Sequence, residues 1–373
     1  MKINPNLKTP YYLVDERLLI RNSDIIKEIK EKSGVKVLLA QKAFSMFHFY
    51  PLLSSYLDGT TASGLFEARL GSELFGKEVH VYAPAYKASD FKEILNYADH
   101  IVFNSVAQVM RFKDEALRQE KTIGLRINPE ISTQGHGLYD PCSPTSRMGT
   151  RIDDFDEAVL PYITGIHFHT LCQQNADALD LTLQVVEQKF GKYFKHLKWI
   201  NFGGGHHITR HDYDRERLIR LITYYRETYG LDVYIEPGEG IVLNSGFLVA
   251  QVLDIVRNDM PIAILDTSAT CHMPDVIEAP FTPPVLGSVT SSAHHYRLSG
   301  YTCLTGDNIG EYYFSKPLEI GDTIVFEDMA LYTMVKNNTF NGIPLPSIYA
   351  RNLMGEDTLV KAFSYNDFKE RLS

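Results

Sequence analysis

Eight short apolar segments, each followed by a longer stretch, constrain the fold of this chain most strongly. Runs of Val, Ile and Leu this short, bounded by glycine or polar residues, are typical of parallel strands that are covered on both faces. Helical patterns fill most of the intervals, as at 64–75, 107–118, 176–190 and 215–229. The predicted strands, in chain order, are Val35–Ala40, Thr60–Ala62, Val79–Tyr82, Ile101–Phe103, Gly124–Ile127, Gly165–Phe168, Trp199–Phe202 and Val233–Ile235.

This alternation predicts an α/β protein with a (β/α)8 barrel over residues 16–240, a fold that typically needs about 250 residues. After Gly240 the rhythm changes, and strands separated by turn residues predict a β-rich second domain over residues 241–373. Strand 11–14 precedes the barrel and is a candidate to pair with that second domain. The strands predicted there are Phe247–Val256, Ile262–Leu265, Tyr296–Cys303 and Thr323–Glu327, with a final helix at Tyr365–Leu372.

Charge and cysteine content narrow the partners and the compartment. The net charge is −9 and we find no basic tract, which argues against nucleic acid and is compatible with a cationic substrate. The four cysteines lie far apart, which is typical of a reducing compartment. The first residues carry no apolar signal core, and no stretch is long enough to span a membrane. We therefore expect a cytoplasmic protein without a membrane partner.

Polar residues follow the predicted strands at the points where a barrel carries its chemistry. Lys42 follows the first strand, Arg126 lies at the end of the fifth and His169 follows the sixth. The turn Gly203–Gly205 follows the seventh strand, and Glu236 ends the eighth. Active sites of such barrels lie at the C-terminal ends of the strands. An amine, an imidazole, a glycine-rich turn and a carboxylate are therefore expected at one rim.

This set of groups suits catalysis with pyridoxal 5′-phosphate. Lys42 would hold the cofactor through a Schiff base, and the N–H groups of Gly203–Gly205 would face its phosphate. Glu236 would lie beside the pyridine nitrogen, because the eighth strand neighbours the first in a closed barrel. A carboxylate there keeps the nitrogen protonated, so that the ring can accept electrons. His169 would stack on the ring face.

The chain resembles the fold-type III pyridoxal phosphate decarboxylases, the family of eukaryotic ornithine decarboxylase and diaminopimelate decarboxylase, whose barrel is of the alanine racemase type. Within the family it is most similar to the branch that decarboxylates carboxynorspermidine or carboxyspermidine, through LLAQKAFSMF, DGTTASGLFEARLG, LDTSATCHMPDV and YTCLTGD. The matching pieces span almost the whole chain in the family's order: Ala40–Lys42, Ala62–Ser63, Phe168–His169, Gly203–Gly205, Glu236–Gly238, Thr302–Cys303 and Tyr332–Thr333.

The resemblance implies catalytic and cofactor-binding roles. Lys42 forms the Schiff base, His169 stacks on the cofactor, and Cys303 is a candidate acid that protonates the substrate Cα after CO2 leaves. Cys303 and Asp307 reach the active site of a partner subunit in this family, so a homodimer with shared sites is implied. The residues implied to contact the cofactor are Lys42, Arg126, His169, Gly204, Gly205, Glu236 and Tyr332.

The departures from the family pattern bear on the substrate. Glu239 stands where the family often has a phosphate-binding arginine, and Leu304 stands where the ornithine and diaminopimelate enzymes carry an acid. An apolar residue at 304 is compatible with a longer polyamine chain. Thr60 replaces an acid near the cofactor, and the sequence around Cys172 departs from the usual small, hydroxyl-bearing run, which puts a phosphate role for Cys172 in doubt.

A carboxylated triamine carries cationic nitrogens and an α-carboxylate. Acidic side chains at Glu239, Asp275 and Asp307 are candidates to bind the nitrogens, although surface acids are usually only solvated. Arg147 is a candidate for the carboxylate, with an ordinary surface role equally open. His272 is a further candidate, for which a structural role is equally plausible.

Other readings of the sequence stay open. One is a decarboxylase of another basic amino acid, such as diaminopimelate or ornithine; another is a racemase or a cofactor-binding protein on the same fold. A third is a metal-dependent barrel hydrolase, because His167 and His169 form an HxH pair at a strand end. That pair ends the sixth strand rather than an early one, and we expect no metal.

Overall fold

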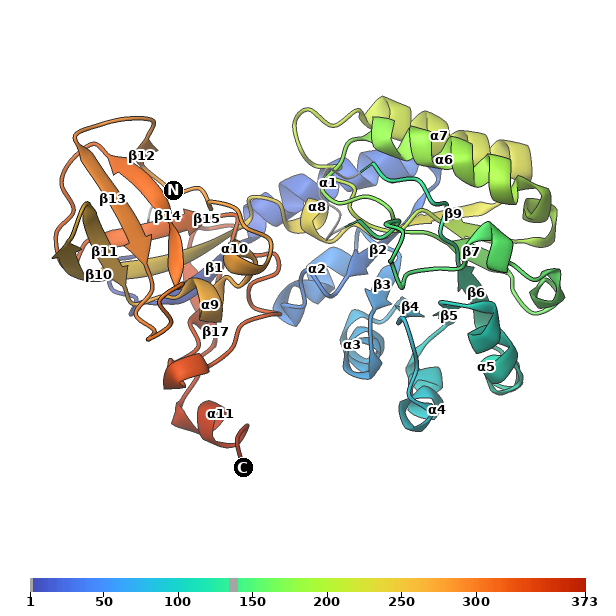
Figure 1. Ribbon diagram of the computed structural model, residues 1–373, viewed down its shortest axis with the longest axis horizontal. Coiled ribbons are helices and arrows are strands. Elements are labelled where there is room, and N and C mark those ends of the chain that lie inside the picture. The colour runs from blue at the N-terminus through green and yellow to red at the C-terminus, as the bar shows by residue number, and fades with distance from the viewer. Residues whose placement is uncertain (1–2, 134–139) are drawn as a thin grey trace. The chain divides into compact units, whose positions relative to one another are not determined.

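A computed structural model describes residues 3–133 and 140–373 of the chain (Figure 1). The contacts within the chain divide it into two compact units. The barrel unit comprises residues 22–42 and 46–241, and the sheet unit comprises the described residues up to Arg21, residues 43–45 and residues 242–373. The domain limits predicted from the sequence, at residues 16 and 240, stay predictions.

Parallel strands of the barrel unit close into a barrel in the order β2 to β9. Closure is made by β2 and β9, where Lys36 pairs with Tyr234 and Val37 with Ile235. Each predicted barrel strand coincides with an observed one to within two residues, and the predicted fold class is confirmed. The strands are β2 (Lys36–Ala40), β3 (Gly59–Ala62), β4 (Glu78–Tyr82), β5 (His100–Phe103), β6 (Thr122–Arg126), β7 (Gly165–His167), β8 (Trp199–Asn201) and β9 (Asp232–Ile235).

Amphipathic helices cover the outside of the barrel (Figure 1). Neighbouring α6 and α7 pack together, and the hydroxyl of Tyr225 on α7 donates to the carbonyl of Leu183 on α6 at 3.1 Å. The side chain of Asn175 caps α6, and α7 ends at Gly230 in a left-handed conformation. The helices are α1 (Glu16–Ser33), α2 (Tyr50–Ser54), α3 (Leu65–Leu70), α4 (Ala88–Tyr97), α5 (Val106–Arg118), α6 (Ala176–Phe190), α7 (Arg215–Tyr229) and α8 (Glu239–Val242).

One predicted helix changes its hydrogen-bond pattern part-way along. The sequence predicts a continuous helix over 64–75, whereas α3 ends at Leu70 and a π-helical turn follows over Gly71–Phe75. Gly71 packs so closely on β3 that a Cβ atom there would lie 2.3 Å from the hydroxyl of Thr60. The wider turn accommodates this close approach.

The barrel interior is filled around the indole of Trp199. Leu38, Val102 and Tyr234 pack with it in one buried cluster. The neighbouring strands carry glycine where the indole lies, since a Cβ at position 165 would be 2.0 Å from the ring and one at position 124 would be 2.4 Å away. Side chains of the remaining strands thus form a packed core rather than a pore.

The sheet unit is built on a mixed sheet in the order β12-β14-β13-β11-β10-β1-β16-β17, with β15 also pairing with β10. Strand β1 pairs antiparallel with β10 and parallel with β16, so the segment that precedes the barrel lies inside this sheet. A large apolar core that includes Tyr12, Leu248 and Phe326 packs on it. The strands are β1 (Tyr11–Asp15), β10 (Gly246–Arg257), β11 (Pro261–Leu265), β12 (Ser288–Val289), β13 (His294–Ser299), β14 (Asn308–Phe314), β15 (Thr323–Glu327), β16 (Ser347–Arg351) and β17 (Asp357–Lys361); the helices are α9 (Ala269–His272), α10 (Asp275–Glu278) and α11 (Tyr365–Lys369).

The predicted strand over Tyr296–Cys303 was wrong at its C-terminal end. Strand β13 ends at Ser299, and Cys303 lies in the loop that leads to β14. The carboxylate of Asp307 occupies the place where a Cβ of Gly300 would stand, 2.2 Å away, and the Gly300 N–H donates to the Asp307 carbonyl at 2.8 Å. The chain therefore turns at Gly300 and cannot continue the strand.

Among the residues that the structure describes, no helix is both long enough and apolar enough to cross a bilayer.

Candidate active site

Side chains from several strand ends gather at the rim of the barrel where the parallel strands finish. Lys42 follows β2, Arg126 ends β6, His169 follows β7 and Glu236 follows β9. The charges of Glu236 and Arg126 both act on the Lys42 amine, and the charges of Lys42 and Arg126 both act on His169. The structure thus brings together the barrel residues that the sequence singled out.

The side chain of Lys42 is exposed to solvent, although protein atoms surround much of its amine. Water reaches this side chain, yet the surrounding protein disfavours its charged form and lowers its pKa below the ordinary lysine value. The positive charge of Arg126 acts in the same direction, while Glu236 and Glu67 oppose it. A lowered pKa increases the fraction of neutral amine, which is the nucleophilic form.

His169 is held as a neutral imidazole. Its Nδ1 accepts a hydrogen bond of 2.8 Å from the N–H of Gly204, and its carbonyl accepts one of 3.2 Å from Arg126. Burial, together with the nearby charges of Lys42 and Arg126, keeps the pKa of His169 well below its ordinary value. A neutral ring with Nδ1 as acceptor carries its proton on Nε2.

The carboxylate of Glu236 is buried and has two side-chain neighbours. Its Oε1 accepts a hydrogen bond of 2.8 Å from Asn201, and its Oε2 lies 3.4 Å from Nε2 of His167. Burial by itself would raise the pKa of Glu236, but His167, His80 and Asn201 outweigh it, so the pKa falls below its ordinary value. Glu236 is therefore an ionised carboxylate at neutral pH.

The turn after β8 requires glycine. Gly203 and Gly205 have φ angles of 71° and 82°, in the left-handed region that side chains with a Cβ rarely adopt. A Cβ at position 204 would lie 2.6 Å from the carbonyl of Glu236, and one at position 205 would lie 2.0 Å from the carbonyl of Leu171. The backbone of this turn is thus in close contact with the loops that carry His169 and Glu236.

Replacing Gly205 with alanine is expected to destabilise the fold by about 1–3 kcal/mol, because the new Cβ has an unfavourable φ and also clashes with backbone. Thermal unfolding measures this loss. Gly230→Ala is the matched control, since Gly230 has a φ of 67° with no atom near its Cβ position. A loss for Gly205→Ala no larger than for Gly230→Ala would contradict the described packing.

Arg126 is directed towards the barrel interior. It is 4% exposed, and its guanidinium lies over the ring of Tyr82 with 4.6 Å to the centroid. The hydroxyl of Tyr82 donates to Asn104 at 2.7 Å. Arg147 is exposed, and its charge lowers the pKa of Tyr82, although burial of that tyrosine has the larger, opposite effect. The predicted roles of Arg126 and Arg147 in binding stay predictions.

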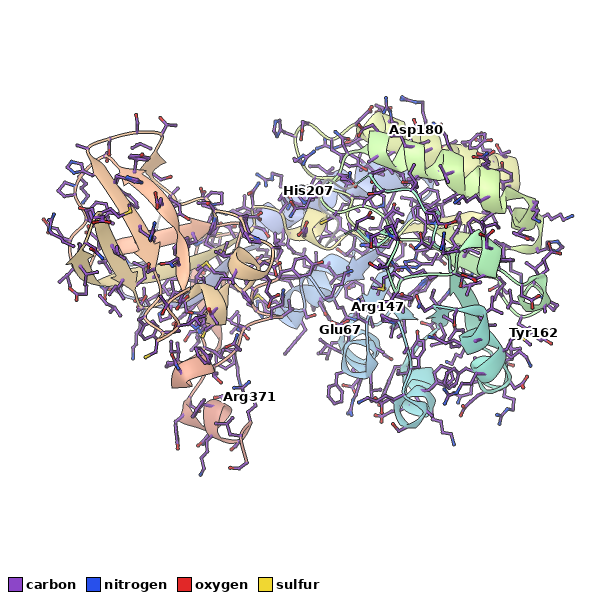
Figure 2. The ribbon with its side chains drawn as sticks, in the orientation of Figure 1. Glu67, Arg147, Tyr162, Asp180, His207 and Arg371 are labelled. Atoms are coloured by element: carbon purple, nitrogen blue, oxygen red, sulfur yellow. The ribbon has the colours of Figure 1, made fainter. Side chains whose placement is uncertain are left out.

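Glu239 is engaged by two side chains of the barrel unit. Its carboxylate lies 3.0 Å from Nε2 of His207 and accepts a hydrogen bond of 3.2 Å from Gln173. Figure 2 labels His207 on the loop that follows β8. Glu239 is thus held at the same rim as the glycine turn.

Two residues near Lys42 and Glu236 were not predicted from the sequence. Glu67 lies on α3 (Figure 2), accepts a hydrogen bond of 2.6 Å from the N–H of Ser63 and acts electrostatically on Lys42. Asn201 ends β8 and contacts Glu236. A signal for Asn201 was present, because it lies two residues after Trp199 and so shares the inward face of the strand.

The remaining candidates lie in the sheet unit. Cys303 is exposed, and its N–H donates to Asn341 at 2.7 Å. Asp307 is buried and accepts hydrogen bonds from the hydroxyl of Thr302 at 2.6 Å and the N–H of Thr270 at 3.2 Å. These bonds give Asp307 a role in shaping the loop that carries Cys303. Its predicted contact with a substrate amine stays a prediction.

Three further sheet-unit candidates also have internal partners. The carboxylate of Asp275, at the start of α10, pairs with the amine of Lys336. Tyr332 has a φ of 47°, and its N–H donates to the carbonyl of Ala43 at 3.0 Å. His272 is buried between Thr267 and the carbonyl of Pro344, at 2.9 Å and 3.2 Å, which is a structural environment. No observation assigns a ligand to these residues.

The histidines considered as metal ligands face different groups. Nε2 of His167 is directed to Glu236, whereas Nδ1 of His169 accepts from Gly204.

At the opposite end of the barrel strands, ligand atoms of Glu78, His80 and His100 lie within 4.8 Å of one another. There the two imidazoles stack at 3.9 Å with planes 11° apart. A single ion cannot lie in both of these ring planes, as nitrogen ligation requires.

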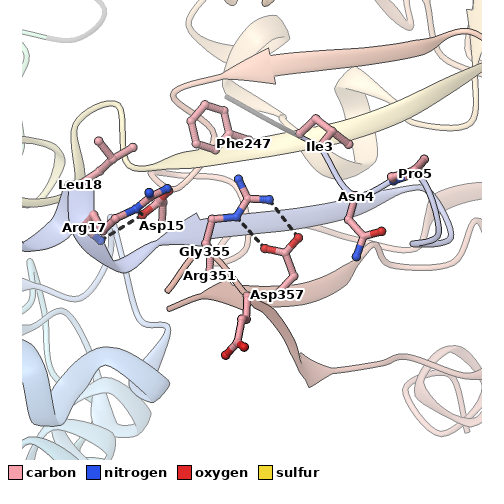
Figure 3. A pocket seen from close by; sticks show the side chains of 11 residues that line it. Ile3, Asn4, Pro5, Asp15, Arg17, Leu18, Phe247, Arg351, Gly355 and Asp357 are labelled. Atoms are coloured by element: carbon pink, nitrogen blue, oxygen red, sulfur yellow. Dashed lines mark hydrogen bonds and ion pairs between the residues drawn. The ribbon is translucent and has the colours of Figure 1, made fainter. Parts of the chain in front are cut away.

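An open cavity of about 850 Å³ lies in the sheet unit (Figure 3). Its apolar wall includes Leu18 and Phe247, and two arginines face it. Arg351 forms a buried ion pair with Asp357 at 2.7 Å, and Arg17 pairs with Asp15 at 2.7 Å. Because the arginine charges are already compensated, the cavity offers little to an anionic ligand.

Comparison with known proteins decides the family. The profile described as "Pyridoxal-dependent decarboxylase, C-terminal sheet domain", of the ornithine, diaminopimelate and arginine decarboxylases, matches residues 12–330. The chain belongs to the pyridoxal-dependent decarboxylase family. The resemblance and the enzyme class predicted from the sequence are confirmed at the level of this family.

Individual members of the pyridoxal-dependent decarboxylase family are similar over the full chain. A carboxynorspermidine/carboxyspermidine decarboxylase of Campylobacter jejuni is 44% identical, with 98% of each chain covered. A carboxyaminopropylagmatine decarboxylase of Synechocystis is 40% identical, over 98% of this chain and 96% of that protein. A crystal structure of the Campylobacter jejuni carboxynorspermidine decarboxylase with norspermidine has a TM-score of 0.91 and 44% identity, covering 98% of this chain and 100% of that one.

Proposed function

We propose that this protein removes the α-carboxylate of carboxynorspermidine, carboxyspermidine or both, with pyridoxal 5′-phosphate as cofactor, to form norspermidine or spermidine in polyamine biosynthesis. The observation that carries the proposal is the 44% identity to the Campylobacter jejuni enzyme over 98% of both chains. The gathering of Lys42, His169 and Glu236 at one barrel rim supports it.

The rim has the groups that this cofactor needs. The pKa of the Lys42 amine is lowered, which favours its reaction with an aldehyde. Gly204 and Gly205 of the glycine turn are the proposed phosphate contacts. The N–H of Gly204 donates to Nδ1 of His169, so a phosphate bound there would exchange that partner. Glu236 is buried and ionised, as a partner of a protonated ring nitrogen must be. Bound pyridoxal 5′-phosphate supplies a sink for the electrons left at Cα when CO2 departs.

The protein's own groups have separate tasks in this scheme. Lys42 would hold the cofactor through its amine. Glu236 would supply a negative charge to the ring nitrogen of the cofactor, and His169 would present a neutral ring face to it. Arg126, which donates to the His169 carbonyl, fixes the backbone on which that ring is carried. The Cα–carboxylate bond breaks, CO2 leaves, and a proton is then added at Cα.

The proton at Cα and the far end of the substrate are assigned to residues of a shared site. Cys303 is the proposed proton donor, reaching the site of the partner subunit in a homodimer. Asp275 and Asp307 are proposed to face the cationic nitrogens, with Glu239 behind them. For Asp307 and Asp275 this requires that their present partners be exchanged for substrate. Arg147 is the proposed partner of the substrate carboxylate and Tyr332 of the cofactor phosphate. The cell compartment that fits such an enzyme is the cytoplasm.

Replacing Cys303 with alanine is expected to leave cofactor binding unchanged and to lower the rate of product formation by about 10²–10⁴-fold, the usual contribution of a general acid. The absorbance of the bound cofactor measures cofactor binding. Mass spectrometry of the amine product measures the rate of product formation. Cys142→Ala, in the barrel unit, is the control. Full activity of Cys303→Ala would remove the thiol from the reaction.

A panel of substrates tests the proposed function. The protein reconstituted with pyridoxal 5′-phosphate is incubated separately with carboxynorspermidine, carboxyspermidine, carboxyaminopropylagmatine, diaminopimelate and ornithine, and CO2 release is measured. The carboxylated triamines are expected to give the highest kcat/KM. The 40% identity to the Synechocystis enzyme makes carboxyaminopropylagmatine the second candidate. Release of CO2 from diaminopimelate or ornithine alone, or racemisation without CO2, would overturn the proposal.

A further inference from the structure

A closed set of three hydrogen bonds joins Glu236 to the glycine turn. The N–H of Glu236 donates to the carbonyl of Gly203, and the N–H of Gly203 donates to Oδ1 of Asn201, each at 2.8 Å. The Nδ2 of Asn201 donates to Oε1 of Glu236, also at 2.8 Å. Asn201 is 0% exposed. The three residues come from the ends of neighbouring strands β8 and β9, which pair in parallel.

The amide orientation in this set is determined by its partners. The Gly203 N–H can only donate, so the Asn201 atom that it meets is the carbonyl oxygen. The amide nitrogen therefore faces Glu236, and Oε1 of Glu236 must accept. A proton on Oε1 would oppose the amide hydrogen, so this bond favours the ionised carboxylate.

The backbone of Asn201 also links these groups to the end of β7. Its carbonyl accepts a hydrogen bond of 3.0 Å from the N–H of Phe168, the residue before His169. One buried residue thus contacts the carboxylate, the glycine turn and the strand end that carries the imidazole. Displacing its side chain would move the first two of these relative to each other.

We propose that Asn201 is a positioning residue for the cofactor, coupling the carboxylate at the ring nitrogen to the turn at the phosphate. The inference rests on the proposed function, because it assigns those two ends of the cofactor to Glu236 and Gly203–Gly205. The side chain acts through these groups and keeps Glu236 ionised while it holds the turn at a fixed distance from it.

The two contacts of Asn201 require an amide side chain at this position. An amide donates through nitrogen and accepts through oxygen at the same time. A carboxylate of the same shape could still accept from Gly203, but it would place a second negative charge beside Glu236. Like charges this close raise the pKa of one of the two groups. A serine could accept from Gly203 but is too short to reach Glu236 as well.

Two variants of Asn201 test the proposal against a matched control. Asn201→Asp and Asn201→Ser are compared with wild type and with Tyr225→Phe, which removes one buried hydrogen bond between α6 and α7. Apoprotein is titrated with pyridoxal 5′-phosphate by absorbance, the absorbance of the bound cofactor is followed against pH, and thermal unfolding is measured for each protein.

Both Asn201 variants are expected to bind the cofactor about 10- to 100-fold more weakly, as is typical when a contact one layer behind a bound group is lost. The absorbance of bound cofactor is expected to change its pH dependence in Asn201→Asp, whereas Tyr225→Phe leaves both properties unchanged. Wild-type affinity and an unchanged pH profile in either folded Asn201 variant would overturn the inference. A wild-type protein that binds no pyridoxal 5′-phosphate would instead overturn the proposed function, and the inference with it.

Discussion

Lys42→Ala is expected to bind pyridoxal 5′-phosphate only reversibly and to lose activity by at least about 10³-fold, within the range that a single acid–base or nucleophilic group contributes. The physical reason is that the variant lacks the amine, whose pKa the barrel rim lowers. Borohydride treatment followed by mass spectrometry measures covalent attachment, and CO2 release measures activity. Retained covalent attachment in Lys42→Ala would show that another lysine holds the cofactor.

A lysine on the same strand provides the control for Lys42. Lys36 lies at the other end of β2, where its amine pairs with Glu78 at 3.1 Å and with Tyr234 at 2.9 Å. Lys36→Met is expected to lose stability but to keep cofactor attachment. The lowered pKa of Lys42 has its own consequence: in the apoprotein at neutral pH, Lys42 should react with an amine-modifying reagent faster than Lys36, whose pKa is raised.

Glu236→Gln is expected to keep the cofactor attached and to lower kcat by about 10²–10³-fold, the usual effect of removing one preorganised electrostatic partner. Glutamine has nearly the same shape but cannot hold a negative charge, so the ring nitrogen loses the group that keeps it protonated. The measurement is kcat together with the absorbance spectrum of the bound cofactor.

A second, partly buried glutamate of the barrel separates this electrostatic effect from a loss of stability. Glu78 begins β4 at the opposite end of the barrel, and its pKa is lowered to about 2, since His80 and Lys36 outweigh the effect of burial. Glu78→Gln is expected to lower the melting temperature and leave kcat near wild type. Equal kcat in Glu236→Gln and wild type would contradict the role of Glu236 at the ring nitrogen.

The barrel could be predicted from the sequence because its signal is local. Apolar segments such as Trp199–Asn201 are short, and they alternate with amphipathic helices such as α6, so segment length together with this alternation determined their type. The rim residues followed from position, since Lys42, His169 and Glu236 come directly after strands whose ends must meet in a closed parallel barrel.

Contacts between side chains distant in the sequence could not be predicted in this way. The end of β13 at Ser299 depends on the carboxylate of Asp307 lying against Gly300, and the π-helical turn after α3 depends on Gly71 lying against Thr60. Neither contact leaves a periodic pattern. Asn201 was missed for a related reason: alternation with Trp199 places it on the inward face of its strand, but only the structure shows its contacts with Glu236 and Gly203.

The proposed function depends most directly on Lys42 holding pyridoxal 5′-phosphate in a decarboxylating site. The decisive measurement is borohydride reduction of the reconstituted protein with and without prior addition of carboxynorspermidine, followed by peptide mass spectrometry. The predicted result is a cofactor adduct on Lys42 that substrate prevents, with release of CO2 and norspermidine. An adduct on another residue, or one on Lys42 that carboxynorspermidine, carboxyspermidine and carboxyaminopropylagmatine all leave unchanged without CO2 release, would contradict it.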